Sequence, residues 1–231
     1  MTTSTPLTAS APPTTSAPTP VPPLPSLAAQ ADRLVALGLH DAAGVTTERL
    51  RDAVARAGDA ESLLVVHPGH VPPSTLAPLL RLGDRPGFVV EDMTDVDAFA
   101  PIPGAEAPSS ALYLLTGLQR GDEMANWSPD EALPAITGAG RTPLTLAEGA
   151  HWALQVADVL DRNHCYMTIG SRLRKPNGRL DARTPALWIS NGTGRDGKER
   201  RNAPKVGWCW AGNRHTWLGF ASAAARVPLE V

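Results

Sequence analysis

Four of the six tryptophans of this 231-residue chain lie between residues 188 and 217, close to a histidine and several arginines. Indole rings offer flat surfaces on which a planar ligand can stack, and arginine side chains bind phosphate or carboxylate groups. Within this region, Gly212-Asn213 separates two strand-like runs, and glycine accepts the positive φ that a two-residue turn requires. The sequence therefore predicts a tight hairpin over residues 206–219.

The predicted turn decides which side chains share one face of the hairpin. Trp210 would face His215, and Trp208 would face Trp217, all on the same side. Two interpretations stay open. Aromatic pairs across strands stabilise many sheet cores, yet three indoles and an imidazole carry four polar nitrogens that a core would have to satisfy. The other interpretation is a partly open aromatic wall that binds a flat ligand.

Two loops rich in glycine and arginine, residues 170–179 and 191–201, flank this segment. Cations beside aromatic faces suit an anionic small molecule such as a nucleotide, or a short single-stranded nucleic acid. No Walker loop, dinucleotide-binding turn or known nucleic-acid motif is present, so solvated loops without a ligand are the alternative. The candidate ligand-binding residues are Arg172, Arg174, Trp188, Arg201, Lys205, Trp208, Trp210, Asn213, His215 and Trp217.

A different hypothesis is a small-molecule enzyme that uses Cys165 or Cys209 with a nearby histidine, His164 or His215. The predicted hairpin places Cys209 and His215 on opposite faces, which disfavours a shared site. The spacing of these residues matches no zinc pattern, so we predict no metal, and no motif indicates a cofactor. Buried cysteines that act as small apolar side chains are the simpler interpretation. The catalytic residues, if any, stay unknown.

Composition and charge limit the possible location and function of the protein. The net charge is −2, but residues 1–163 carry 19 acidic and nine basic residues, whereas residues 164–217 carry three acidic and 11 basic ones. Two cysteines, no basic and apolar leader and no run of about 18 apolar residues predict a cytoplasmic protein without a membrane span. A third hypothesis is a non-catalytic interaction partner that uses its N-terminal tail and acidic helices. The oligomeric state stays open.

Local patterns predict an α+β fold. Residues 1–25 are nearly all proline, threonine, serine and alanine, which predicts a disordered tail before one domain over residues 26–231. The domain is expected to be mainly helical over about 26–163 and rich in antiparallel strands over about 164–231. Predicted helices cover residues 27–37, 48–57, 74–82, a segment from 129 and 146–161, with caps at Ser26, Thr47, Ser128 and Thr145. Predicted strands cover residues 63–66, 87–90, 111–116, 165–170, 186–190, 206–211 and 215–223.

Three segments resemble a known family. They are residues 141–145, residues 185–190 and, above all, residues 207–219, whose sequence is Gly-Trp-Cys-Trp-Ala-Gly-Asn-Arg-His-Thr-Trp-Leu-Gly. On these residues the chain is similar to an uncharacterised family of actinobacterial proteins, a domain of unknown function, over roughly residues 27–225. The resemblance implies a bacterial cytoplasmic protein and supplies no substrate, cofactor or catalytic residue. The basic insert around 195–201 departs from the family pattern, which puts a role for that loop in doubt.

Overall fold

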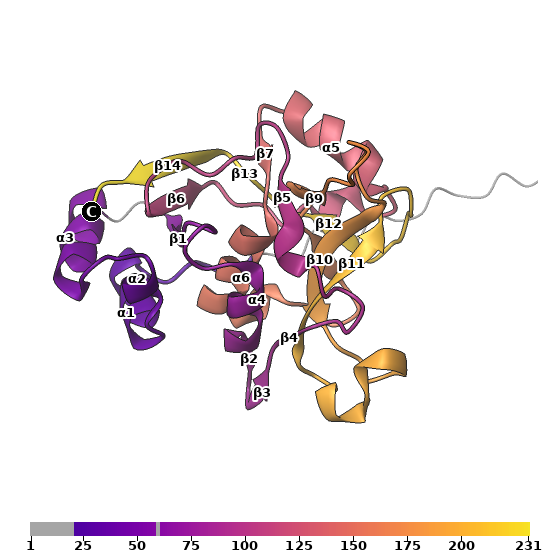
Figure 1. Cartoon of the computed structure of the whole chain (residues 1–231), viewed down its shortest axis with the longest axis horizontal. Coiled ribbons are helices and arrows are strands. Elements are labelled where there is room, and N and C mark those ends of the chain that lie inside the picture. The colour runs from indigo at the N-terminus through magenta and orange to yellow at the C-terminus, as the bar shows by residue number, and fades with distance from the viewer. Residues whose placement is uncertain (1–20, 59–60) are drawn as a thin grey trace, which may run out of the picture.

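The computed structural model describes residues 21–231 apart from residues 59–60 and the side chain of Arg195. Most of the predicted N-terminal tail, residues 1–20, lies outside this range. Helices and strands are both present, which confirms the predicted α+β class. Helices α1–α3 lie at one end of the molecule and a five-stranded sheet lies at the other, with α4 and α6 between them (Figure 1). None of the described helices is both long and apolar enough to cross a lipid bilayer.

The N-terminal helices form where the sequence places their caps. Helix α1 (Leu27–Ala36) starts at Ser26, whose hydroxyl oxygen accepts a hydrogen bond from the backbone amide of Ala29. Helix α2 (Leu39–Ala42) follows at once. Helix α3 (Thr47–Ala57) is capped by Thr46 and not by Thr47, because the Thr46 side chain accepts from the third amide of the helix. The predicted helix was right and its cap was one residue late.

A three-stranded antiparallel sheet joins segments that are far apart in the sequence. It has the order β1 (Ser62–Val66), β6 (Leu112–Thr116), β14 (Ala225–Leu229). Strand β14, which the sequence patterns did not predict, carries the C-terminus back to α3 (Figure 1). There the backbone carbonyl of Glu230 accepts a hydrogen bond of 2.9 Å from Arg56. The last residues of the chain therefore complete the sheet that its first strand begins.

The second sheet is mixed and contains most of the predicted C-terminal strands. Its order is β12 (Leu218–Phe220), β8 (Cys165–Met167), β10 (Arg183–Ile189), β11 (Pro204–Trp210), β4 (Phe88–Val89). The outer pairs, β12 with β8 and β11 with β4, are parallel, and the inner pairs are antiparallel. One face packs against the large apolar core around α6, and the other packs against a smaller cluster beneath α5.

The remaining elements are short or connect the two sheets. The helices are α4 (Pro73–Leu76), α5 (Pro129–Gly138) and α6 (Leu146–Gln155). The strands are β2 (Arg81–Leu82), β3 (Arg85–Pro86), β5 (Phe99–Pro101), β7 (Thr142–Pro143), β9 (Ser171–Leu173) and β13 (Ser222–Ala223). Single 3₁₀ turns span Ala77–Leu79, Val96–Ala98, Asp122–Met124, Ala157–Val159, Gly194–Asp196 and Lys198–Arg200.

Two predicted helices are shorter than expected. The helix predicted over residues 74–82 breaks after α4 into a 3₁₀ turn that contains Pro78, and Leu80 is then extended. Helix α6 ends at Gln155 and not near Asp161, because Val156 takes an extended conformation and a 3₁₀ turn follows. All ten residues of α6 are buried, so this helix is the centre of the core rather than an amphipathic surface helix.

The predicted hairpin at Gly212-Asn213 is wrong. Strand β12 does not pair with β11 but lies at the far side of the sheet, where it pairs with β8. The physical reason is that the run after the turn pairs elsewhere, since Leu218–Phe220 form a parallel ladder with Cys165–Met167 of β8. Strand β10 occupies one edge along its whole length and β4 occupies part of the other. In this register, Trp208 pairs with Pro185 and Trp210 pairs with Arg183, so Trp217 and His215 are not their cross-strand partners.

Candidate ligand-binding site

The predicted aromatic wall is divided between the two faces of the second sheet. Directly paired residues share a face, and side chains alternate along a strand. Trp188 pairs with Lys205, three residues from Trp208, so the two indoles point to opposite faces. Trp188 packs against the small core cluster and Trp208 against the large one. These two tryptophans therefore do not line one site.

Two of the predicted cations already have anionic partners. The ammonium of Lys205 lies 2.7 and 2.8 Å from the carboxylate oxygens of Asp196 and 4.7 Å from the centre of the Trp188 ring. Arg172 is almost fully buried, donates to the backbone carbonyl of Asp181 at 2.8 Å and lies 3.7 Å from Asp130. Both charges are balanced within the protein.

The other two predicted arginines belong to loops. Arg174 donates to the carbonyl of Gly178 within its own loop, at 2.7 Å. Arg201 is exposed and lies just before β11, whereas Trp210 ends that strand. A seven-residue strand is about 20 Å long. The basic loop over residues 191–201 is thus one strand length away from the exposed end of the tryptophan segment.

Three indoles remain exposed, and they come from the 125–128 loop, the end of β11 and the loop that follows β11. Trp127, Trp210 and Trp217 have 42%, 47% and 48% of their surface exposed and are the aromatic members of the large, exposed apolar side chains in the described part of the chain. The ring of Trp217 stacks on that of His215, with centres 4.6 Å apart and planes 14° from parallel. Trp210 contacts Trp208 edge to face at 4.5 Å.

Hydrogen bonds and an ion pair hold these two loops together. The amide of Asn126 donates to the carbonyl of His215 at 2.9 Å, and the amide of Asp130 donates to that of Ala211 at 3.1 Å. Arg214 forms an ion pair with Glu131. Residues 125–131 and 211–217 therefore form one continuous surface, although they are about 85 positions apart in sequence.

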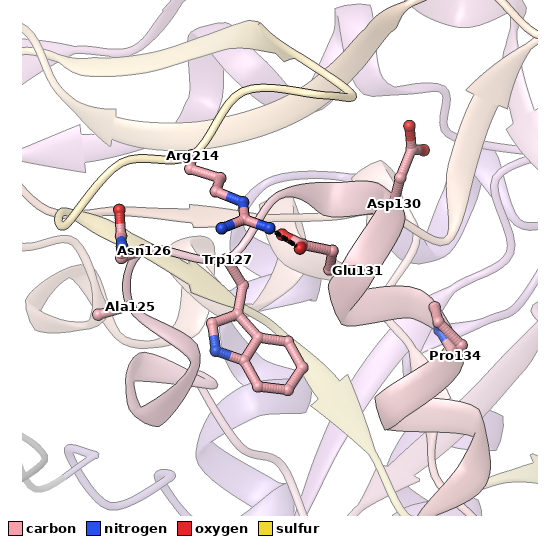
Figure 2. A pocket seen from close by; sticks show the side chains of 7 residues that line it. All are labelled: Ala125, Asn126, Trp127, Asp130, Glu131, Pro134 and Arg214. Carbon is pink, nitrogen blue, oxygen red and sulfur yellow. Dashed lines mark hydrogen bonds and ion pairs between the residues drawn. The ribbon is translucent and has the colours of Figure 1, made fainter.

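A cleft opens between these loops and the first turns of α5. We call it the aromatic cleft; its volume is about 590 Å³, and its lining residues are Ala125, Asn126, Trp127, Asp130, Glu131, Pro134 and Arg214. Figure 2 shows the indole of Trp127 between the 125–127 loop and α5, next to the Arg214–Glu131 ion pair. An apolar ring flanked by a few convergent polar groups is the usual composition of a small-ligand site.

Glu131 has two roles in this cleft. It completes the capping box of α5, in which its carboxylate accepts from the amide and hydroxyl of Ser128, both at 2.9 Å. These hydrogen bonds, with a smaller contribution from Arg214, hold the pKa of Glu131 below its usual value. Its other carboxylate oxygen pairs with Arg214. The carboxylate is therefore fixed in position and ionised at neutral pH.

The sequence patterns missed Asn126, Trp127, Asp130 and Glu131. Glu131 completes the capping box of α5, a local role that does not exclude a second one in the cleft. A usable signal was Trp127 directly before the N-cap, where an apolar side chain normally packs on the fourth helical residue. That residue is Ala132, which is small and fully buried, and the large indole of Trp127 stays partly outside.

The two thiols lie together in the small core cluster, where the Cys165 thiol donates to the carbonyl of Trp217 at 3.7 Å. Interaction with Cys209 and burial raise the pKa of Cys165, and interaction with Cys165 lowers the pKa of Cys209. His164 instead contacts the guanidinium of Arg120 at 2.8 Å, and His215 stacks on Trp217. Among the described residues, no group of three or more His, Cys, Asp and Glu side chains could hold a metal ion.

Comparison with curated proteins and with solved structures gave no match. A sequence model of the family of unknown function DUF5701 matches residues 33–229, which is most of the chain and includes every residue of the aromatic cleft. The predicted actinobacterial origin and the family-specific C-terminal motif stay predictions. The chain belongs to the family of unknown function DUF5701.

Proposed function

We propose that this protein binds a small ligand in the aromatic cleft, with a flat face of the ligand stacked on Trp127. The observation that carries the proposal is the partly exposed indole of Trp127 beside the Arg214–Glu131 ion pair in a cleft of about 590 Å³. A ligand that covers the indole removes apolar surface from water, which favours binding, and a cleft of this size lies in the usual range for small-ligand sites.

The proposal keeps the binding hypothesis but moves its site. The sequence placed the ligand on residues 206–219 and two basic loops, whereas the supporting geometry lies between residues 125–131 and 211–217. Of the ten predicted residues, three lie in the 211–217 loop: Asn213, His215 and Trp217. A fourth, Arg172, contacts Asp130 at the margin of the aromatic cleft. A cytoplasmic location remains part of the proposal, supported by the low cysteine count alone.

Binding can be tested by calorimetric titration with three probes that differ in charge: adenosine monophosphate, maltotriose and triarginine. At least one should bind, and Trp127→Ala should weaken that binding tenfold or more, because loss of a stacking ring costs about 1–3 kcal/mol. Trp210→Ala is the matched control, since its indole is similarly exposed but does not line the cleft. No heat from any probe at 10 mM, or equal losses in both variants, would refute the proposal.

A further inference from the structure

We infer that the ligand of the aromatic cleft is a neutral carbohydrate, an oligosaccharide with one ring stacked on Trp127 and its hydroxyl groups bonded to Arg214, Glu131 and Asp130. This inference rests on the proposed function and names its ligand class. It replaces the flat anionic ligand that the sequence predicts.

The charges of the cleft are balanced before any ligand arrives. Arg214 pairs with Glu131, and Asp130 lies 3.7 Å from Arg172. An anion would have to compete with a carboxylate for each guanidinium and would lie next to two carboxylates. A cation would have to compete with Arg214 and Arg172 for their carboxylate partners and would lie next to two guanidinium groups. A neutral ligand avoids both, because it leaves each ion pair in place.

The first turn of α5 does not offer a phosphate site either. Helix N-termini bind anions through free backbone amides. Here the amide of Asp130 donates to the carbonyl of Ala211, and the amide of Glu131 donates to the Ser128 hydroxyl. Pro129 has no amide hydrogen. The amides that a phosphate would need are therefore already used.

The remaining hydrogen-bonding capacity matches hydroxyl groups. A guanidinium has five N–H donors and an ionised carboxylate accepts about four hydrogen bonds, so the Arg214–Glu131 pair keeps unused donors and acceptors side by side. Asn126 and Asp130 add a side-chain amide and a second carboxylate to the lining. A hydroxyl group both donates and accepts, and a row of them can bond to such a mixed surface without carrying charge.

The indole of Trp127 matches the apolar face of a sugar ring. A pyranose ring has a flat face of C–H groups and a rim of hydroxyl groups. The face of Trp127 offers a rigid apolar surface, and the Arg214–Glu131 pair lies along one side of it, as Figure 2 shows. A cleft of about 590 Å³ has room for more than one sugar ring.

The test is calorimetric titration of the full chain with maltotriose, cellotriose and triacetylchitotriose, with adenosine monophosphate and triarginine as charged probes. We expect at least one sugar to bind, with a tenfold or greater loss in Trp127→Ala and little change in Trp210→Ala. Arg214→Met should weaken the same sugar at least fivefold. Arg214 is largely exposed, so this variant should stay folded, and its circular dichroism and melting temperature check that. Raising NaCl from 50 to 500 mM should leave the affinity for the sugar nearly unchanged.

Two outcomes would overturn the inference, and they differ in what they leave standing. If adenosine monophosphate or triarginine binds in a Trp127-dependent way and no sugar does, the ligand class is wrong and the proposed binding function survives. If neither the sugars nor the charged probes bind, both statements fail.

Discussion

Arg226 of β14 binds both carboxylate oxygens of Glu148 in the core, with Nε 2.6 Å from Oε1 and Nη2 2.7 Å from Oε2. The two side chains have only 7% and 0% of their surface exposed. Burial lowers the pKa of Arg226, but the hydrogen bonds and charge of Glu148 outweigh it and raise that pKa above its usual value. The hydroxyl of Tyr113 also donates to Glu148, at 3.0 Å. The pair thus joins the C-terminal strand to the central helix.

Replacing Arg226 by methionine should lower the free energy of unfolding by about 3–5 kcal/mol, because Glu148 would keep a buried charge without its partner. Urea unfolding followed by circular dichroism measures this. Arg51→Met is the matched control, since Arg51 pairs with Asp32 at the surface, where both side chains are 60% exposed. That change should cost less than about 1 kcal/mol. Similar losses in the two variants would contradict a special role for the buried pair.

His151 should make the protein less stable as the solution becomes acidic. Its Nδ1 donates to the carbonyl of Ala147 and its Nε2 accepts from the amide of Val66, so the buried ring is held neutral. Burial lowers its pKa from 6.5 to about 4. The unfolded chain binds the proton near pH 6.5 and the folded chain does not, so this contribution is complete above pH 6.5 and is lost as pH falls toward 4. The expected loss is about 2 kcal/mol between pH 7 and pH 5.

Urea unfolding at several pH values tests this, with His151→Gln for comparison. Burial also lowers the pKa values of His67 and His164, which act in the same direction. The difference between the wild type and the variant therefore isolates His151. An NMR titration of the wild-type ring gives a second reading that does not depend on the variant folding. A ring that titrates near pH 6.5 in the folded protein would disprove the prediction.

Gly149 of α6 should not tolerate a methyl group, although alanine favours helices. A Cβ atom there would overlap Thr168 Cγ2 and lie 3.2 Å from Leu187 and Tyr166 side-chain atoms. We expect Gly149→Ala to destabilise by about 1–3 kcal/mol through overpacking. Gly138 of α5 has open space at the same position, so Gly138→Ala should stabilise by up to about 1 kcal/mol. Urea unfolding should show a lower free energy of unfolding for Gly149→Ala and a higher one for Gly138→Ala. A change in the same direction for both variants would contradict the prediction.

The two cysteines should differ in reactivity. Their interaction lowers the pKa of Cys209 and, with burial, raises that of Cys165, and thiolates are the reactive form. Iodoacetamide at pH 7.5 should therefore modify Cys209 at least tenfold faster, as measured by peptide mass spectrometry. Cys165→Ala should slow the reaction of Cys209, because alanine removes the neighbouring thiol that lowers the pKa of Cys209. Faster modification of Cys165 than of Cys209 in the wild-type protein would contradict the prediction.

Local chemistry explains what the sequence predicted correctly. Ser26, Ser128 and Thr145 each cap a helix through atoms three residues away, and these contacts depend on neighbours along the chain alone. The predicted cap at Thr47 is one position late, because the adjacent Thr46 carries the same hydroxyl group and is the actual cap. Most predicted strands exist, with bounds shifted by a few residues, since branched and aromatic runs fit an extended backbone.

Pairing between distant segments could not be predicted in this way. The turn signal at Gly212-Asn213 predicts a hairpin because the two flanking runs are adjacent in sequence, but the second run pairs with β8 on the far side of the sheet. The aromatic cleft was missed for the same reason. Trp127 and Arg214 approach each other only because the amide of Asn126 binds the carbonyl of His215, a contact that no local pattern encodes.

The position of β14 has a consequence for folding. Residues 225–229 cover one edge of β6, which lies more than 100 positions before them in the sequence. Until β14 docks, the folding polypeptide displays an unpaired, apolar strand edge that can pair with other chains. Deletion of residues 225–231 should therefore yield aggregates rather than a shortened native protein.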